Sequence, residues 1–229
     1  MSFFSENFIF WDIHTHQIPD GKKDEVKIFN VFPYKKDAVS PTQSSAYFSI
    51  GLHPWHIESN WQDDFANIQE LAKLSNCLAI GECGLDRAIN TPLEIQLSIF
   101  QKHILLSETA QKPLIIHCVR AYPDIISLHK KHKVKQKWIL HAYQGNETLT
   151  KQILRYPNFL FSFGKGLWNP KVESIFKRLP LERCFLETDD STLSVQEIYL
   201  KASTIRQIYL EELKQIIQVN VLNTLFKNV

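Results

Sequence analysis

Short apolar runs alternate with segments of helical periodicity along most of the chain. Eight runs are rich in β-branched and aromatic residues, and each ends in polar residues; they cover residues 8–16, 26–32, 46–54, 77–86, 113–121, 137–145, 158–166 and 183–190. Continuous apolar stretches such as residues 114–116 and 159–161 are typical of strands buried on both faces of a parallel sheet. We therefore expect eight strands in a largely parallel sheet.

Most segments between these runs have apolar residues at helical spacing. In residues 61–75, Phe65, Ile68 and Leu71 recur every three positions. A long helix is expected from Thr91 and Pro92 onward, because proline fits the first helical turn. Further helices are expected in residues 122–133, 146–156, 170–179 and 194–227, the last long enough for two packed helices. The alternation predicts an α/β fold, and eight strands indicate a TIM-like (β/α)8 barrel.

The connections after the first two runs do not follow this pattern. Residues 17–25 contain Pro19 and Gly21 without apolar periodicity, and residues 33–45 contain two prolines and several hydroxyl residues. Neither is long or periodic enough for the usual covering helix. We therefore expect a barrel with shortened first βα units. No linker-like stretch divides the chain, so residues 1–229 are expected to form a single domain.

Composition excludes several classes of protein. Of 229 residues, 44% are hydrophobic and 22% are charged, which is ordinary for a globular chain and not for a disordered one. A net charge of +2 excludes a strongly basic protein that coats nucleic acid by charge alone. No apolar run is long enough to span a membrane and no signal peptide is recognisable, so we expect a cytoplasmic protein with no membrane partner. Four cysteines without a C-x-x-C pair are expected to be free thiols.

Side chains that bind metals gather where the apolar runs end. Asp12, His14 and His16 alternate along the first run, so they point to one face of the strand. Other runs end in Glu82, His117, His141 and Asp189. Because the carboxyl ends of parallel barrel strands lie on one face, these residues are expected to come together there.

An H-x-H pair alone is more often two surface or packed histidines. Four further ligand-type residues, each at the end of a different strand, favour a metal site instead. Imidazole nitrogen and carboxylate oxygen suit Zn²⁺ or Mn²⁺, and they suit Mg²⁺ less well because it prefers oxygen ligands. Six ligands are too many for one tetrahedral zinc ion and about right for two divalent cations that share a bridging carboxylate.

The motifs around these residues resemble those of the TatD family of metal-dependent hydrolases. The matching blocks are D-I-H-T-H at 12–16, G-L-H-P at 51–54, G-E-C-G-L-D at 81–86, I-H at 116–117, H-A-Y-Q-G at 141–145 and L-E-T-D at 186–189. The resemblance implies a TIM-like barrel and metal-dependent hydrolysis of ester bonds, most often the phosphodiester bonds of DNA.

The resemblance also implies a role for each matched residue. His14 and His16 would hold one cation with Asp189, and Glu82 would bridge to a second cation held by His117 and His141. Asp189 would also deprotonate the attacking water, which makes Asp189 and Glu82 the expected catalytic residues. His53 would face the substrate phosphate. Asp12 would support the histidines from behind, since metal-bound imidazoles need orientation.

Three positions depart from the family pattern. Arg87 stands where the family usually has tyrosine, Val119 where it has arginine with Arg120 one residue later, and Asp190 where it has alanine. The metal-binding set is therefore intact while the substrate-contact set is not. Hydrolase chemistry is thus better supported than DNA specificity, and a metal-dependent hydrolase of a small-molecule amide, lactone or phosphoester stays open. So does a non-enzymatic barrel that binds a partner through a flank at residues 17–45.

Several other residues have two interpretations at this stage. Trp55 and Trp168 could stack on a base or simply pack at the rim, and His56 could line the site or lie in an ordinary loop. The lysines of residues 130–137 could contact a phosphate backbone or form a solvated helix end. Phe161, Phe163 and Phe185 are expected to fill the barrel interior.

Overall fold

The computed structural model describes residues 8–19, 21–33 and 46–226. Its central feature is a sheet of parallel strands that follow one another in chain order. Within the described residues this sheet has eight strands: β1 (Phe10–Thr15), β2 (Glu25–Val31), β3 (Tyr47–Ile50), β4 (Cys77–Asp86), β5 (Leu114–Val119), β6 (Trp138–Leu140), β7 (Phe159–Phe163) and β8 (Cys184–Leu186). The predicted α/β fold with eight parallel strands is confirmed.

The sheet closes on itself between its first and last strands. Thr15 and Asp189 form a parallel bridge, the amide of Asp189 donates to the carbonyl of His14, and the amide of His16 donates to the carbonyl of Asp189. Closure therefore occurs at the carboxyl ends of β1 and β8. The result is the TIM-like barrel expected from the sequence.

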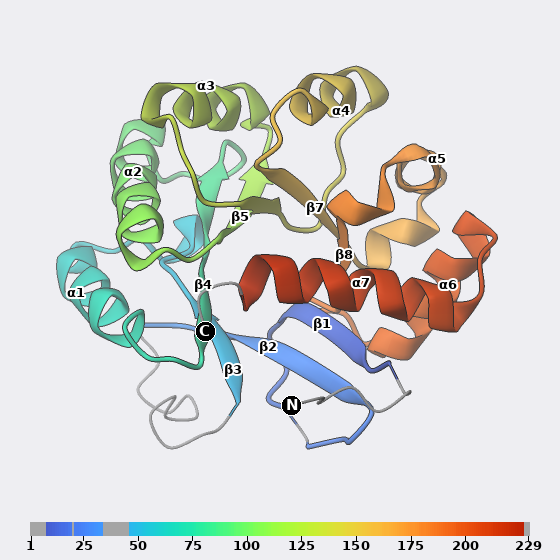
Figure 1. Ribbon diagram of the computed structural model, residues 1–229. Helices are drawn as coiled ribbons and strands as arrows, with labels where there is room; N and C mark the ends of the chain where they lie inside the picture. The colour runs from blue at the N-terminus through green and yellow to red at the C-terminus, as the bar shows by residue number, and fades with distance from the viewer. Residues whose placement is uncertain (1–7, 20, 34–45, 227–229) are drawn as a thin grey trace.

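Helices cover the barrel from its third unit onward (Figure 1). They are α1 (Trp61–Leu71), α2 (Leu93–Ala110), α3 (Tyr122–His132), α4 (Glu147–Leu154), α5 (Pro170–Arg178), α6 (Val195–Arg206) and α7 (Leu210–Leu225), with short 3-10 turns η1 (Pro54–His56), η2 (Lys165–Trp168) and η3 (Leu181–Arg183). The last predicted helical segment is indeed two helices, α6 and α7. None of these helices is both long and apolar enough to cross a membrane.

The first βα unit lacks a covering helix, as predicted. Residues 17–19 and 21–24, which connect β1 to β2, contain no helix. The prediction for the second unit falls on residues 33–45, of which 34–45 lie outside the described part of the chain. The proposed binding flank of residues 17–45 lies largely outside it as well.

The core has two layers, one inside the barrel and one between strands and helices. Phe163 packs edge-on against Phe176 of α5 at 5.0 Å between ring centroids, so it belongs to the outer layer. Phe161 shares that face of β7, because strand side chains alternate. Phe185 lies opposite Ser162 in the register, on the other face. The prediction that all three phenylalanines fill the barrel is therefore wrong for Phe161 and Phe163.

Gly84 shows why the end of β4 needs glycine. Its φ is +150°, and a Cβ atom there would lie 2.0 Å from the carbonyl oxygen of His117 on β5. The two backbones thus approach more closely than any side chain permits. This contact fixes Glu82 on β4 and His117 on β5 beside each other.

Candidate metal centre

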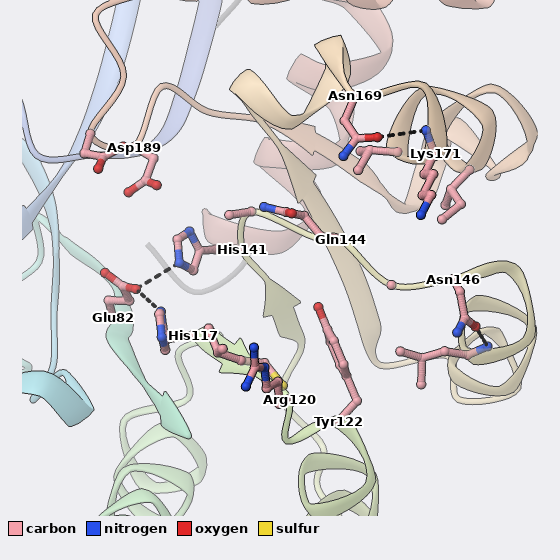
Figure 2. Close-up of a pocket in the computed structure, with 18 of the residues that line it drawn as sticks. Glu82, His117, Arg120, Tyr122, His141, Gln144, Asn146, Asn169, Lys171 and Asp189 are labelled. Atoms are coloured by element: carbon pink, nitrogen blue, oxygen red, sulfur yellow. Dashed lines mark hydrogen bonds and ion pairs between the residues drawn. The ribbon is translucent and has the colours of Figure 1, made fainter. Parts of the chain in front are cut away.

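Seven polar side chains converge at the carboxyl ends of the barrel strands. β1 provides His14 and, just beyond its end, His16; β4 provides Glu82 and β5 provides His117. His53, His141 and Asp189 follow the ends of β3, β6 and β8. Figure 2 shows Glu82, His117, His141 and Asp189 facing one another at one end of a pocket. All the residues named from the sequence as metal ligands are therefore brought together.

Glu82 lies at the middle of this cluster, and its side chain is only 4% exposed. Its Oε1 atom is 2.9 Å from Nε2 of His141, 3.0 Å from Nδ1 of His117 and 3.2 Å from Nε2 of His53. Its Oε2 atom is 3.3 Å from Nε2 of His14 and 3.6 Å from Nε2 of His16. One carboxylate thus faces five imidazoles, with a different set at each oxygen.

Asp189 completes the side of the cluster that belongs to β1. Its Oδ1 atom is 3.3 Å from Nε2 of His16 and 3.8 Å from Nε2 of His14. The residue has a φ of 56°, in the left-handed region that aspartate tolerates better than most side chains. The carboxylate is partly exposed, at 20%, so water or substrate can reach it.

The donor set fits divalent cations. Three groups of side chains each bring three ligand atoms within 4.8 Å of one another: His14, His16 and Glu82; His14, His141 and Asp189; and His53, Glu82 and His117. His14 is fully buried, yet neither of its ring nitrogens makes a hydrogen bond of normal geometry within the described residues. Buried polar atoms normally have partners, so this imidazole fits a ligand role.

Electrostatics keep the central carboxylate charged. Burial alone would raise the pKa of Glu82, but His141, the hydrogen bond from His117 and the neighbouring ring of His14 outweigh it and hold this pKa well below its usual range. Burial lowers the pKa of His53, against the opposing effect of Glu82. Glu82 is thus held as an anion and the neutral form of His53 is favoured, and these are the forms that bind metals. Glu82 and Glu187 outweigh burial and raise the pKa of His141, so that without metal this ring carries a proton that a bound cation would displace.

Two outer carboxylates orient the imidazoles, and no role was assigned to either from the sequence. Oδ2 of Asp86 accepts a hydrogen bond from Nε2 of His117 at 3.2 Å, which turns Nδ1 of that ring toward Glu82. Oε1 of Glu187 lies 3.4 Å from Nδ1 of His141. Both residues lie inside the G-E-C-G-L-D and L-E-T-D blocks. Carboxylate partners of this kind could have been sought in the sequence, because a metal-bound imidazole generally needs a hydrogen-bond partner on its other nitrogen.

Asp12 does not support the histidines in the way the family resemblance implied. Its two carboxylate oxygens accept hydrogen bonds from Thr188, at 2.9 Å from the amide and 2.6 Å from the hydroxyl. Burial raises the pKa of Asp12 to about 7, against the effect of these bonds. Asp12 therefore ties β1 to the segment after β8 and acts on the ligands through the backbone.

An open pocket of about 1330 Å³ extends from the cluster across the mouth of the barrel. One side is aromatic and carries Phe32, Trp55 and His56. The other side carries hydrogen-bond donors from the loops around α3, α4 and α5, namely Arg120, Gln144, Asn146, Asn169 and Lys171 (Figure 2). Asn146 and Asn169 cap α4 and α5 through their Oδ1 atoms, which leaves the donor end of each amide for other partners.

Only some of the positions that depart from the family pattern line the pocket. Arg87 pairs with Asp124 at the start of α3, 2.9 Å between Nη2 and Oδ2, and does not line the pocket. Arg120 and Val119 both line it. Asp190 lines it too, but its carboxylate is paired with Lys165 at 2.5 Å. Trp168 and the lysines of residues 130–137 do not line the pocket.

Comparison with known protein families identifies the family of this chain. The model of the TatD related DNase family matches residues 31–227. This chain belongs to the TatD-related DNase family. The match includes His53, Glu82, His117, His141 and Asp189 but begins after β1. In this member of the TatD family, the closed barrel is what brings His14 and His16 to the remaining candidate ligands.

Several curated relatives of this TatD-family chain are hydrolases or nucleases by name. It is 31% identical over 150 residues to an uncharacterized metal-dependent hydrolase, YabD, from Bacillus subtilis, covering 62% of this chain and 58% of that protein. It is 31% identical over 168 residues to the 3′-5′ ssDNA/RNA exonuclease TatD from Dickeya dadantii, covering 69% of this chain and 62% of that protein. The chain thus spans less than two thirds of these relatives.

Solved structures share the fold of this TatD-family chain. The TatD homologue YJJV from Escherichia coli superposes with a TM-score of 0.78 at 18% identity, covering 95% of this chain and 98% of that one. A TatD family hydrolase from Entamoeba histolytica superposes with a TM-score of 0.76 at 19% identity, covering 97% and 99%. At this level of identity the likeness establishes the barrel alone.

Proposed function

We propose that this chain is a metal-dependent nuclease that hydrolyses phosphodiester bonds in DNA or single-stranded nucleic acid. One observation carries the proposal: a buried carboxylate faces five imidazoles at the mouth of a TIM-like barrel, with Asp189 beside them. The names of relatives, among them 3′-5′ ssDNA/RNA exonuclease, support a single strand as substrate.

The proposed ligands are His14, His16, Glu82, His117, His141 and Asp189, with Glu82 shared between two divalent cations, Zn²⁺, Mn²⁺ or Mg²⁺. Bound cations would supply Lewis acidity that activates water and offsets charge on the departing oxygen. Sharing is supported by the two oxygens of Glu82, which face different sets of imidazoles. The imidazole-rich set favours Zn²⁺ or Mn²⁺.

The chain's own residues supply proton transfer and orientation. Asp189 is the proposed base, because its carboxylate is ionised and open to the pocket; hydrogen bonding from His16 helps to hold its pKa below the usual range, against burial. His53 is proposed to face the scissile phosphate. It also lies within reach of Glu82 at 3.2 Å, so a ligand role is the alternative for this residue.

The donor side of the pocket supports a polyanionic substrate. Arg120 and Lys171 bring positive charge to it, and the capping amides of α4 and α5 add neutral donors. Contacts of this kind bind phosphate oxygens without reading base sequence. We therefore propose that the strand leading to the scissile bond lies on this side.

The decisive experiment is a nuclease assay on protein purified without chelator and then loaded separately with Mg²⁺, Mn²⁺ or Zn²⁺. End-labelled single- and double-stranded oligonucleotides would be the substrates. Asp189→Asn is expected to lower kcat by about 10²- to 10⁴-fold with the fold intact, as for loss of a general base. Asp63→Asn, an exposed aspartate on α1, is the matched control. Absence of cleavage with all three metals would contradict the proposal.

Hydrolysis of a small-molecule amide, lactone or phosphoester is the second candidate. The observation that favours it is the carboxylate of Asp190 at the pocket, which is unsuited to a polyanion. Its ion pair with Lys165 weakens this argument. A substrate panel measured beside the oligonucleotides separates the two, because turnover of nucleic acid alone would remove the second candidate.

A further inference from the structure

Trp55 presents a large apolar surface at the edge of the metal cluster. Its side chain lines the pocket and is 60% exposed. It lies in η1, directly after His53 and Pro54, so the backbone places it beside the proposed phosphate-facing histidine. An exposed indole at this place leaves apolar area that a bound ligand could cover.

Two hydrogen bonds hold Trp55 in position, one from its indole and one from its backbone. Its Nε1 atom donates to Oδ2 of Asp86 at 2.7 Å, and its backbone amide donates to Nδ1 of His53 at 3.1 Å. Asp86 is only 2% exposed, so the acceptor itself is fixed inside the protein. An aromatic side chain held in this way loses little conformational freedom when a ligand stacks on it.

The nearest rings do not stack on the indole. His53 and His117 meet it edge to face, with centroids at 5.1 and 5.9 Å and interplanar angles of 87° and 75°. No other aromatic ring among the described residues contacts it. A planar group that enters the pocket next to the cluster therefore has an indole surface available.

The hydrogen bond from Trp55 to Asp86 also links the indole to the cluster of candidate ligands. Oδ2 of Asp86 accepts from both Nε1 of Trp55 and Nε2 of His117, and Nδ1 of His117 faces Glu82 at 3.0 Å. A ring stacked on Trp55 would thus lie beside the side chains that surround the scissile phosphate.

We propose that Trp55 is a stacking platform for the nucleobase next to the scissile phosphate. This inference rests on the proposed nuclease function and adds a base subsite to it. Stacking accepts any base, because every base has a π-face, so the subsite would select for an unpaired nucleotide without selecting its sequence. A base within a duplex stack could not be covered in this way.

The test compares substrates with and without a base at the proposed position. Single-stranded oligonucleotides carry either thymidine or an abasic tetrahydrofuran residue at the nucleotides flanking the cleaved bond. Trp55→Ala is expected to raise KM for the thymidine strand by roughly 5- to 100-fold, in the range of measured base–aromatic stacking. It is expected to change KM for the abasic strand much less.

Two further variants separate stacking from other effects. Trp55→Phe loses the bond to Asp86 but keeps an aromatic face, so its KM for the thymidine strand should rise less than that of Trp55→Ala. Trp168→Ala removes another exposed indole, 47% exposed and outside the pocket, and should leave KM unchanged. Equal effects of Trp55→Ala on both strands, or equal effects of the alanine and phenylalanine variants, would overturn the inference.

A binding measurement keeps this test separate from the nuclease proposal. In protein treated with chelator, the thymidine strand should quench tryptophan fluorescence in the wild type and much less in Trp55→Phe, while the abasic strand should quench neither strongly. Quenching without cleavage under any metal would support the platform and contradict the nuclease. Cleavage without any dependence on the base would support the nuclease and overturn the platform.

Discussion

The carboxylate of Glu82 faces five imidazoles from four segments of the chain, and two of these imidazoles lie on or just after β1. No other side chain described in the site has so many ligand-type neighbours. Its position explains why most of the ring nitrogens point inward, since each has the same anion to face. The centre of the site therefore depends on the charge of one residue.

Removing the negative charge of Glu82 should abolish the effect of divalent metal on the thermal stability of the protein. For Glu82→Gln, which keeps the size of the side chain, we expect loss of the stabilisation that divalent metal gives the wild type. A cation at 100 times its Kd stabilises the native state by about 2.7 kcal/mol. Thermal unfolding with Mn²⁺ or Zn²⁺ against chelator measures this difference. Glu70→Gln, an exposed glutamate on α1, should retain the full shift, and equal shifts in both variants would contradict the prediction.

His103 gives a separate prediction about pH. Its ring is fully buried in α2, where Nε2 accepts from the amide of Leu52 at 3.0 Å and Nδ1 is 2.9 Å from the carbonyl of Ile99. Burial lowers its pKa to about 4, against the opposing bond to Ile99. The unfolded chain then takes up this proton first as pH falls, so stability is full above about pH 6.5 and is lost toward pH 4.

The size of this effect is measurable. Between pH 7.5 and pH 5, the free energy of unfolding should fall by about 2 kcal/mol on account of His103 alone. Denaturant titrations of chelated wild type and His103→Gln at both pH values give the difference. Proton NMR of the histidine ring supplies a second check, because a His103 resonance that titrates near pH 6.5 would refute the argument.

At the scale of elements, α5 is held at its carboxyl end by a side chain from α6. Nη1 of Arg206 donates to the carbonyls of Phe176, Lys177 and Leu179, at 2.8, 3.0 and 2.7 Å. These carbonyls would otherwise lack partners at the end of the helix. The amino end of the same helix brings Asn169 and Lys171 to the pocket, so this contact also fixes part of the donor side.

We expect Arg206→Ala to cost about 2–3 kcal/mol in the free energy of unfolding, because several hydrogen bonds from a charged donor are lost together. The matched control is Arg178→Ala on α5, whose guanidinium is 67% exposed and lies 3.4 Å from Glu147. An exposed ion pair of this kind contributes less than about 1 kcal/mol. Similar losses in both variants, measured by denaturant unfolding, would contradict the assignment.

The elements themselves could be predicted from the sequence because their signals are local. Apolar runs, helical spacing and the polar residues at strand ends are enough to predict the barrel and the meeting of the candidate ligands at its mouth. The facing of Phe161 and Phe163 was not predictable in this way, because residues on either face of a parallel barrel strand are equally apolar. Distinguishing them requires the register between strands.

The partners of the ligands were also beyond local signals. Asp86 and Glu187 lie in the recognised motifs, but their contacts with His117 and His141 join different strands. The family resemblance implies a place for Asp12 behind the histidines, whereas its carboxylate binds Thr188 across the junction of β1 and β8. The donor side of the pocket comes from loops after three separate strands, so no single segment of sequence marks it.

For the whole molecule, a net charge of +2 predicts weak non-specific attraction to nucleic acid. The salt dependence of binding should then come from a few residues in the pocket. Lys171→Ala should reduce the slope of log K against log salt by about 0.7 for a single-stranded oligonucleotide, as for loss of one phosphate contact. Lys177→Ala, an exposed lysine at the other end of α5, should leave the slope unchanged.

This comparison is made by fluorescence anisotropy of a labelled strand over a range of salt concentrations, with chelator present to prevent cleavage. A slope that falls equally in both lysine variants would show that the surface as a whole attracts the strand, and it would contradict a defined path through the pocket.

The junction that closes the barrel is made by the backbone of proposed ligands. The amide of His16 donates to Asp189 and the amide of Asp189 donates to His14, so the only described backbone bonds between the ends of β1 and the segment after β8 belong to proposed ligands. A cation that binds those side chains would therefore stabilise the junction between β1 and β8, and with it the closed barrel. Hydrogen exchange of these two amides should slow when metal is added and quicken under chelator, while buried amides of β5 stay constant. The rate of local opening at the β1–β8 junction would then report whether the site holds metal.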